Sequence, residues 1–270
     1  MTQSPAPPAS PSPSLAVWST GDYRRIGLLL PYMSEVMVEA VDLRAGERVL
    51  DVASGSGNAA LAAARRNATV TATDIVPELL AHARTRAAAE LVEIETVEAD
   101  AQDLSFPDAS FDVVTSAIGV MFVPDQQRAA DELVRVLRPG GRVALASWCQ
   151  DGFIGDLFSA TAKHAPPPAG AVPPFRWGSA DGLTALLGDR IEWQRQERLS
   201  QRIRFSSAAA FVDLFATMYG PTMKALARLD EAGQAALRDD LAGLAEAANL
   251  ATDGTCALDW DYLLAVGVRR

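Results

Sequence analysis

Cysteine and histidine are scarce in this chain, and their scarcity excludes several kinds of site. The 270 residues include only two cysteines, Cys149 and Cys256, and two histidines. Two cysteines far apart in the sequence form neither a disulfide framework nor a metal-ligand spacing. We therefore expect a reducing, cytoplasmic setting and no bound metal.

The chain also lacks an excess of positive charge and long apolar runs. Lysine and arginine total 24 against 34 acidic residues, which gives a formal net charge of −10. Proteins that neutralise nucleic-acid phosphates or approach anionic lipid need a basic field. No apolar run is long enough to cross a bilayer. These absences argue against nucleic-acid and membrane partners, and favour a small-molecule substrate that is neutral or cationic.

Proline and serine are concentrated at the N-terminus. Residues 1–14 are rich in proline, serine and alanine, and they lack the basic and apolar segments of a secretion signal. We expect this stretch to be a disordered tail. The remaining chain, residues 15–270, is long enough to bury one large core and is expected to form a single domain.

Strands and helices alternate through the first half of the chain. Apolar residues at steps of three and four between positions 26 and 43 predict a leading helix. The following pattern predicts strands at 48–54, 68–76, 92–98, 111–116 and 142–148, with helices at 58–66, 77–90 and 125–137. Alternation of this kind builds a parallel sheet that is covered by helices on both faces.

The second half is less regular. It predicts a helix at 153–163, a stiff Pro166–Pro168 segment, a long strand at 191–205, three helical stretches between 207 and 250, and a closing strand at 257–270. We expect the closing strand to complete the sheet at its edge. The helices before it would then roof the site.

A glycine-containing turn follows the first predicted strand. In the segment Asp51–Gly57, Gly55 and Gly57 allow the backbone to turn sharply and a ligand to approach it closely. Gly55, Gly57 and Ala60 also fit the G-x-G-x-x-A form of a dinucleotide site. The turn alone does not choose between nucleotide ligands, and it could also serve only to pack a helix on a strand.

Acidic residues stand at the ends of the next two strands. Asp74 could accept hydrogen bonds from both hydroxyls of a ribose. Asp100 and the backbone N–H that follows it could read the polar edge of adenine, although a solvated acidic turn is the alternative. All three features fall at the carboxyl ends of successive strands, where open α/β sheets bind ligands. Together they indicate a nucleoside site.

Five ordered segments resemble the class I S-adenosylmethionine (SAM) dependent methyltransferases: Val49–Gly57, Thr73–Ile75, Glu98–Ala101, Phe111–Val114 and Leu137–Gly141. The flanking segments Trp18–Tyr23 and Lys163–Pro168 are similar to a bacterial small-molecule branch of that family, which includes ubiquinone and menaquinone methyltransferases. The resemblance implies an α/β, Rossmann-like fold. Its sheet would have seven mostly parallel strands with an antiparallel last strand, helices on both faces and a helical lid.

The same resemblance divides the domain and assigns cofactor contacts. Residues 44–150 would form the core, and residues 15–43, 151–180 and 206–250 would form lid elements around the substrate. The cofactor SAM would be contacted by Tyr23, Asp51, Ala53, Gly55, Gly57, Asp74, Ile75, Asp100, Ala101 and Ser116. The family more often has glycine at position 53, and cysteine or glycine at position 54. Alanine and serine are also small, so we expect binding to be retained.

Two alternatives share part of this pattern. An NAD(P)-dependent short-chain dehydrogenase needs a Tyr-x-x-x-Lys pair, but the only lysines, Lys163 and Lys224, do not follow a tyrosine at that spacing. The sequence therefore disfavours hydride transfer. A SAM-binding decarboxylase, a cyclase or a non-catalytic binding module stays open, because fold and cofactor do not fix the reaction.

The acceptor side is less well defined by the sequence. Methyl transfer from a sulfonium chiefly requires alignment and exclusion of water, and His164 is the candidate if a general base assists. A residue that only interacts with the helix dipole is the other interpretation of His164. Candidate substrate-binding residues are Trp18, Phe215, Met218 and Tyr219, each of which could instead pack in the core. We predict methylation of O, N or C of a small metabolite, such as a natural-product or quinone-like intermediate, by an enzyme that could form a homodimer.

Overall fold

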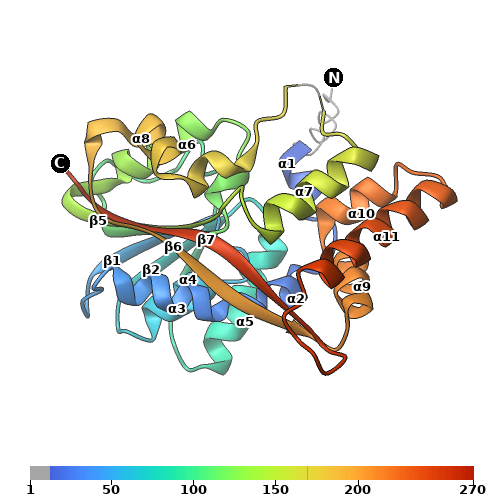
Figure 1. Cartoon of the computed structure of the whole chain (residues 1–270). Coiled ribbons are helices and arrows are strands. Elements are labelled where there is room, and N and C mark those ends of the chain that lie inside the picture. Colours follow the sequence, from blue (N-terminus) through green and yellow to red (C-terminus); the bar gives the residue numbers. More distant parts are fainter. Residues whose placement is uncertain (1–12, 169) are drawn as a thin grey trace, which may run out of the picture.

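The computed structural model describes residues 13–168 and 170–270 (Figure 1). Residues 1–12 of the predicted tail lie outside the described residues. Helix α1 (Pro13–Trp18) begins within the stretch assigned to the tail. The domain boundary expected at residue 15 therefore falls inside a helix.

A single sheet with strand order β3-β2-β1-β4-β5-β7-β6 forms the centre of the described chain. Its strands are β1 (Arg48–Val52), β2 (Thr69–Asp74), β3 (Glu95–Glu98), β4 (Phe111–Ala117), β5 (Leu137–Trp148), β6 (Ile191–Phe205) and β7 (Cys256–Arg269). The first five strands pair in parallel. Only β7 runs against its neighbours β5 and β6. The predicted Rossmann-like sheet with an antiparallel last strand is confirmed.

The closing strand does not lie at the edge of the sheet, so that expectation was wrong. β7 lies between β5 and β6, and β6 forms the edge. β7 is apolar and buried along most of its length, whereas β6 exposes many charged side chains. An apolar strand gains most from burial on both faces, while charges on an edge strand discourage pairing with another chain.

Helices cover both faces of the sheet, with α3, α4 and α5 on one face and α6 and α8 on the other (Figure 1). Helices α7 and α9–α11 gather beyond one end of the sheet. The helices after α1 are α2 (Tyr23–Gly27), α3 (Pro31–Ala40), α4 (Asn58–Ala64), α5 (Pro77–Ala89), α6 (Gln126–Val136), α7 (Phe153–His164), α8 (Ala180–Leu187), α9 (Ala208–Met218), α10 (Gly220–Leu226) and α11 (Glu231–Ala247). Short 3₁₀ turns are η1 (Val120–Phe122), η2 (Pro174–Gly178) and η3 (Gly188–Arg190).

The leading helix predicted over positions 26–43 is two helices in the structure. α2 ends at Gly27 and α3 begins at Pro31. Proline has no N–H to continue a helix and disfavours helical backbone in the residue before it, but it is well suited to the first turn. The break at Pro31 lets α2 turn away from α3 and contact α5 and α9.

No helix among the described residues is long and apolar enough to cross a membrane. The core is built from the inner strands and from alanine-rich α4, whose residues 59–64 are all buried. Small side chains let α4 pack closely on the sheet. This places the start of α4 directly beside the end of β1, where the predicted cofactor site lies.

Candidate cofactor and acceptor site

The turn between β1 and α4, residues 53–57, is here called the cofactor turn. Ala53, Gly55 and Gly57 all have positive φ angles, of 53°, 55° and 86°. A Cβ atom on Gly55 would meet nothing within 4 Å, so this face of the turn is open to a ligand. A Cβ on Gly57 would lie 2.8 Å from Cβ of Ala83 on α5. Gly55 thus offers room for the cofactor, whereas Gly57 is required for helix packing.

Asp51 holds the cofactor turn in place. Its buried carboxylate, only 1% exposed, accepts hydrogen bonds from Thr115 Oγ1 at 2.9 Å, Ser54 Oγ at 2.5 Å and the Ala60 N–H at 3.1 Å. Burial raises the pKa of Asp51 to about 6, although these hydrogen bonds oppose the shift. The carboxylate therefore joins β1, β4 and α4 around the turn. Its charge is available to attract a cationic group.

Asp74 lies at the end of β2, next to the same turn. One carboxylate oxygen accepts from the Gly55 N–H at 2.8 Å, and the other accepts from the Val76 N–H at 3.0 Å. Burial raises the pKa of Asp74. Each carboxylate oxygen has two lone pairs, so both can also accept from ribose hydroxyls. Ile75 follows directly and is half-buried, as a residue that covers one face of adenine would be.

The loop after β3 carries Asp100 and Ala101 to the same edge of the sheet. The Ala99 N–H donates to the Asp74 carbonyl at 3.1 Å, so the two strand ends are joined. Asp100 is exposed and accepts from the Gln102 N–H at 2.9 Å, while Ala101 is buried. The carboxylate of Asp100 is therefore fixed at the surface of the site, close to Asp74.

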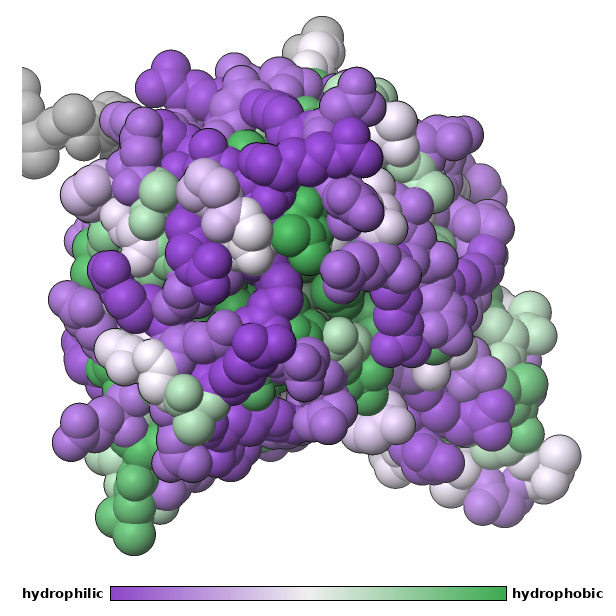
Figure 2. Space-filling view, turned by 90° about the vertical axis from the view of Figure 1, so that its left-hand side faces the viewer, coloured by the Kyte–Doolittle hydropathy of each residue, from purple (hydrophilic) through white to green (hydrophobic). Residues whose placement is uncertain are grey.

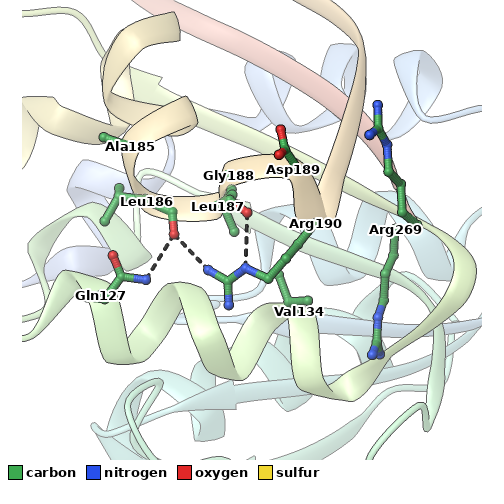
Figure 3. Close-up of a pocket in the computed structure, with 10 residues that line it drawn as sticks. Gln127, Val134, Ala185, Leu186, Leu187, Gly188, Asp189, Arg190 and Arg269 are labelled. Carbon is green, nitrogen blue, oxygen red and sulfur yellow. Dashed lines mark hydrogen bonds between the residues drawn. The ribbon is translucent and has the colours of Figure 1, made fainter.

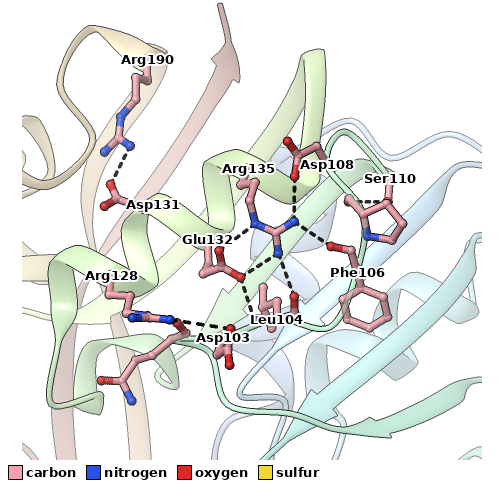
Figure 4. Close-up of polar contacts among 12 residues, drawn as sticks. Asp103, Leu104, Phe106, Asp108, Ser110, Arg128, Asp131, Glu132, Arg135 and Arg190 are labelled. Carbon is pink, nitrogen blue, oxygen red and sulfur yellow. Dashed lines mark hydrogen bonds and ion pairs between the residues drawn. The ribbon is translucent and has the colours of Figure 1, made fainter.

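Polar contacts from α6 fix the continuation of that loop (Figure 4). Arg128 Nε donates to the Gln102 carbonyl at 2.6 Å, and Glu132 accepts from the Leu104 N–H at 2.7 Å. Arg135 donates to the carbonyls of Leu104 and Phe106 and forms an ion pair with Glu132. These bonds replace the regular hydrogen bonding that an irregular loop lacks.

Ser116 at the end of β4 is engaged with the protein itself. Its hydroxyl donates to the Val52 carbonyl at 2.7 Å and accepts from the Val120 N–H at 3.0 Å. It therefore positions η1 relative to the end of β1. A contact between Ser116 and the sulfonium end of the cofactor stays a prediction.

Gly119 is a site residue that the sequence reasoning missed. A Cβ at this position would lie 2.4 Å from the Ala53 carbonyl oxygen and 2.7 Å from the Ala53 Cβ. Only glycine allows η1 to pack this closely on the cofactor turn. The sequence signal that could have identified this residue is a single glycine shortly after β4, three residues before Phe122.

Six partly buried aromatic residues form what we call the aromatic row, which passes through η1. Its members are Trp18, Tyr23, Phe122, Phe158, Phe175 and Tyr219. Successive ring centroids are 6.1 Å apart for Tyr219 and Tyr23, and 4.8 Å for Trp18 and Phe122. Phe122 and Phe158 lie nearly parallel, at 14° and 6.3 Å. Phe122, Phe158 and Phe175 were not predicted, because the sequence does not show that η1, α7 and η2 meet.

The four predicted substrate-binding residues divide between this row and the core. Trp18 and Tyr219 belong to the row, and Met218 is half-buried beside it, where its carbonyl accepts from the Asp22 N–H at 3.0 Å. Phe215 is only 3% exposed and packs against Phe211, Tyr219 and Trp260. Its side chain is part of the buried core, and a contact between Phe215 and the substrate stays a prediction.

Tyr23, predicted to contact the cofactor, lies in the same row. Its hydroxyl is buried beside the Gly220 backbone, with no well-aligned hydrogen-bond partner among the described residues. Burial raises the pKa of its phenol far above the ordinary value. The hydroxyl is therefore a neutral donor at any physiological pH.

His164 ends α7 and turns toward α11. Its Nε2 lies 3.0 Å from the Asp240 carboxylate, and Lys163 lies 3.7 Å from the same group. These contacts lower the pKa of Asp240. The hydrogen bond that the structure gives His164 thus leads to an outer helix and not to the strand ends, and its role as a base stays a prediction.

One pocket among the described residues lies away from this site. It has a volume of about 560 Å³ and is lined by residues that include Val134, Leu187, Arg190 and Arg269 (Figure 3). Figure 2 shows the side of the molecule that carries the C-terminus, where apolar side chains gather in a hollow among polar ones. Arg190 already donates to the carbonyls of Leu186 and Leu187. The pocket borders the amino ends of the parallel strands, opposite the cofactor turn.

Comparisons with known proteins agree with the cofactor site. Residues 50–145 match the family described as "Methyltransferase domain". An uncharacterised protein of Mycobacterium tuberculosis is 41% identical over 94% of this chain and 93% of its own length. Demethylmenaquinone methyltransferase of Deinococcus radiodurans is 37% identical over 58% of this chain and 66% of its own length.

Solved structures show the same fold. The YcgJ protein from Bacillus subtilis has a TM-score of 0.63 at 22% identity, over 88% of this chain and 99% of that one. A geranyl diphosphate methyltransferase in complex with SAM has a TM-score of 0.54 at 15% identity, over 92% and 88% of the two chains. With the open Gly55, the buried Asp74 and the matched family in agreement, this chain belongs to the class I SAM-dependent methyltransferases, and SAM is its cofactor.

Proposed function

We propose that this enzyme transfers the methyl group of SAM to O, N or C of a small apolar metabolite that binds against the aromatic row. The observation that carries the proposal is the position of η1. Gly119 packs on Ala53 of the cofactor turn, and Phe122 follows three residues later, in the middle of the row between Trp18 and Phe158. An apolar acceptor held by these rings would lie beside the cofactor.

The residues of the site fit the cofactor. Asp74 would accept hydrogen bonds from the ribose hydroxyls, Gly55 leaves its face of the turn open, and the charge of Asp51 would attract the ammonium group. When bound, SAM supplies an electrophilic methyl group on a sulfonium. The rings of the row would exclude water and align the acceptor, which is the main requirement of an in-line displacement.

A general base is not required by this arrangement. If His164 acts as one, it would have to do so through Nδ1, because Nε2 is hydrogen-bonded to Asp240. The −10 net charge also suits a small molecule better than a nucleic acid as the acceptor.

A screen with isotopically labelled SAM tests the proposal. Panels of flat apolar, saturated apolar and charged acceptors are incubated with the enzyme, and both labelled product and S-adenosylhomocysteine are measured. We expect labelled product from apolar acceptors, and a loss of roughly tenfold in kcat/KM for Phe122→Leu, which removes the ring but keeps apolar volume. Phe106→Leu is the matched control, since Phe106 packs on Phe111 at the amino end of β4.

Three outcomes would contradict the proposal. They are transfer only to charged acceptors, equal turnover by the Phe122→Leu variant, and conversion of an acceptor without formation of S-adenosylhomocysteine. The last result would instead support the alternative of SAM-dependent chemistry other than methyl transfer, which the fold also permits.

A further inference from the structure

We propose that Asn58 is a positioning residue that latches the N-terminal lid segment, residues 15–30, onto the cofactor turn. Asn58 is the first residue of α4, and its side-chain Nδ2 donates to the Gly27 carbonyl at 2.8 Å. Gly27 is the last residue of α2, and its carbonyl also accepts from the Leu30 N–H at 3.1 Å, just beyond the helix. The inference rests on the cofactor site and is independent of the choice of acceptor.

Arg86 of α5 fixes the orientation of the Asn58 amide. Its guanidinium donates to the Asn58 Oδ1 at 2.8 Å and to the Ser56 carbonyl at 2.7 Å. Asn58 Oδ1 therefore faces the cation, and Nδ2 must face Gly27. Arg86 is half-buried without an ion pair among the described residues, and burial lowers its pKa. One cation thus holds both the cofactor turn and the residue that binds the lid segment.

The contact requires close approach of α2 to the turn. A Cβ on Gly27 would lie 2.6 Å from Oγ of Ser56. A side chain at this position would require either rotation of the Ser56 hydroxyl or movement of α2 away from the turn, which would stretch the bond to Asn58. The glycine and the asparagine therefore form a matched pair, one on each side of the contact.

The lid segment is also fixed at its other end. The Asp22 N–H donates to the Met218 carbonyl at 3.0 Å, and Gly21 forms an antiparallel bridge with Tyr219. Trp18 and Tyr23 of the aromatic row lie in this segment. The segment therefore joins the turn that holds the cofactor to the helices beside the aromatic row, with Asn58 as its attachment on the cofactor side.

A small cavity lies where the chain leaves the lid segment and passes over the turn. It has a volume of about 30 Å³ and is lined by residues that include Leu30, Ser34, Asp51 and Asn58. The Ser34 hydroxyl is 1% exposed and has no hydrogen-bond partner among the described residues. A buried polar group without a partner is costly, so its presence here points to a polar ligand group or water at this edge of the turn.

Asn58→Asp tests the latch with little change in shape. The substitution keeps an oxygen for Arg86 but removes the N–H that donates to the Gly27 carbonyl, and it places a carboxylate against that carbonyl. We expect the Kd for SAM to rise by roughly tenfold, and hydrogen exchange to increase in residues 15–30 but not in β1 or β4. Asn67→Asp, at an exposed position three residues beyond the end of α4, makes the same change of charge and should leave both readouts unchanged.

A second variant reaches the same contact from the other side. Gly27→Ala keeps Asn58 and Arg86 but places a methyl group against Ser56, so it should raise the Kd for SAM and the exchange of residues 15–30 in the same way. A Kd within twofold of wild type for both variants would overturn the proposal. So would an increase in exchange spread over the whole chain, because that would indicate general destabilisation and not release of the lid segment.

Discussion

The two halves of this molecule are specified in different ways. In residues 48–148, the parallel strands end in short turns. Asp51, Gly55 and Asp74 fix the geometry of these turns through hydrogen bonds and glycine backbone conformation. In residues 151–269, aromatic side chains from distant elements pack on one another, as Phe153, Phe211 and Trp260 do. The first half carries the turns around the cofactor site, while the second half is held together mainly by aromatic packing. Substitutions in the two halves should affect different measurements.

Trp260→Ala should have the largest effect on stability and almost none on cofactor affinity. Trp260 is 2% exposed and contacts three aromatic rings besides Trp148 of β5. Truncation should lower the free energy of unfolding by about 3–5 kcal/mol, measured by urea denaturation, while the Kd for SAM stays within threefold at a temperature where the variant is folded. A large loss of SAM affinity would show that the two halves are not separable.

Asp51→Asn should change the pH dependence of stability. The folded-state pKa of Asp51, about 6, is above the ordinary carboxyl value of 3.8, so the folded protein binds a proton that the unfolded chain has released. Stability contributed by this proton is present at low pH and is lost as pH rises toward 6. Wild type should lose about 2–3 kcal/mol relative to the variant between pH 4 and 7, measured by denaturation across that range. Parallel pH profiles for the two proteins would contradict this assignment.

Gly57→Ala should lower the free energy of unfolding more than Gly46→Ala does, although both glycines have similar positive φ angles, of 86° and 83°. A Cβ at Gly46 meets nothing within 4 Å, whereas one at Gly57 meets Ala83. We expect the free energy of unfolding, measured by urea denaturation, to fall by about 1 kcal/mol for Gly46→Ala because of backbone strain. For Gly57→Ala it should fall by roughly 2–3 kcal/mol, because overpacking adds to the strain. Equal values would mean that α5 moves freely and that the packing role of Gly57 is wrong.

Among these variants, His164→Ala should have the smallest effect on stability and on kcat. The His164 pair with Asp240 lies near the surface, where such pairs contribute little to the free energy of unfolding. Because methyl transfer is expected to depend on alignment, kcat should fall by less than about threefold. A loss of about a hundredfold or more, with a changed pH profile, would restore His164 as the general base.

The sequence predicted the first half well because its signals are local. The glycines after β1, the carboxylates after β2 and β3, and the alternation of elements each depend on neighbours in the chain. It predicted the second half less well. Helix α8 was missed, although the Ser179 N-cap and the terminal Gly188 were available signals, and the order of β6 and β7 depends on burial. Phe122 and Phe158 meet only after folding, and no pattern in the sequence around either residue indicates that contact.

Calorimetric titration of the wild-type chain and its Asp74→Ala variant with SAM and with NADH tests the central claim most directly. The account predicts that wild type binds SAM and not NADH, and that Asp74→Ala weakens SAM binding at least tenfold, because the acceptor for the ribose hydroxyls and the bond to Gly55 are both removed. Binding of NADH without SAM, or unchanged SAM affinity in the variant, would contradict it.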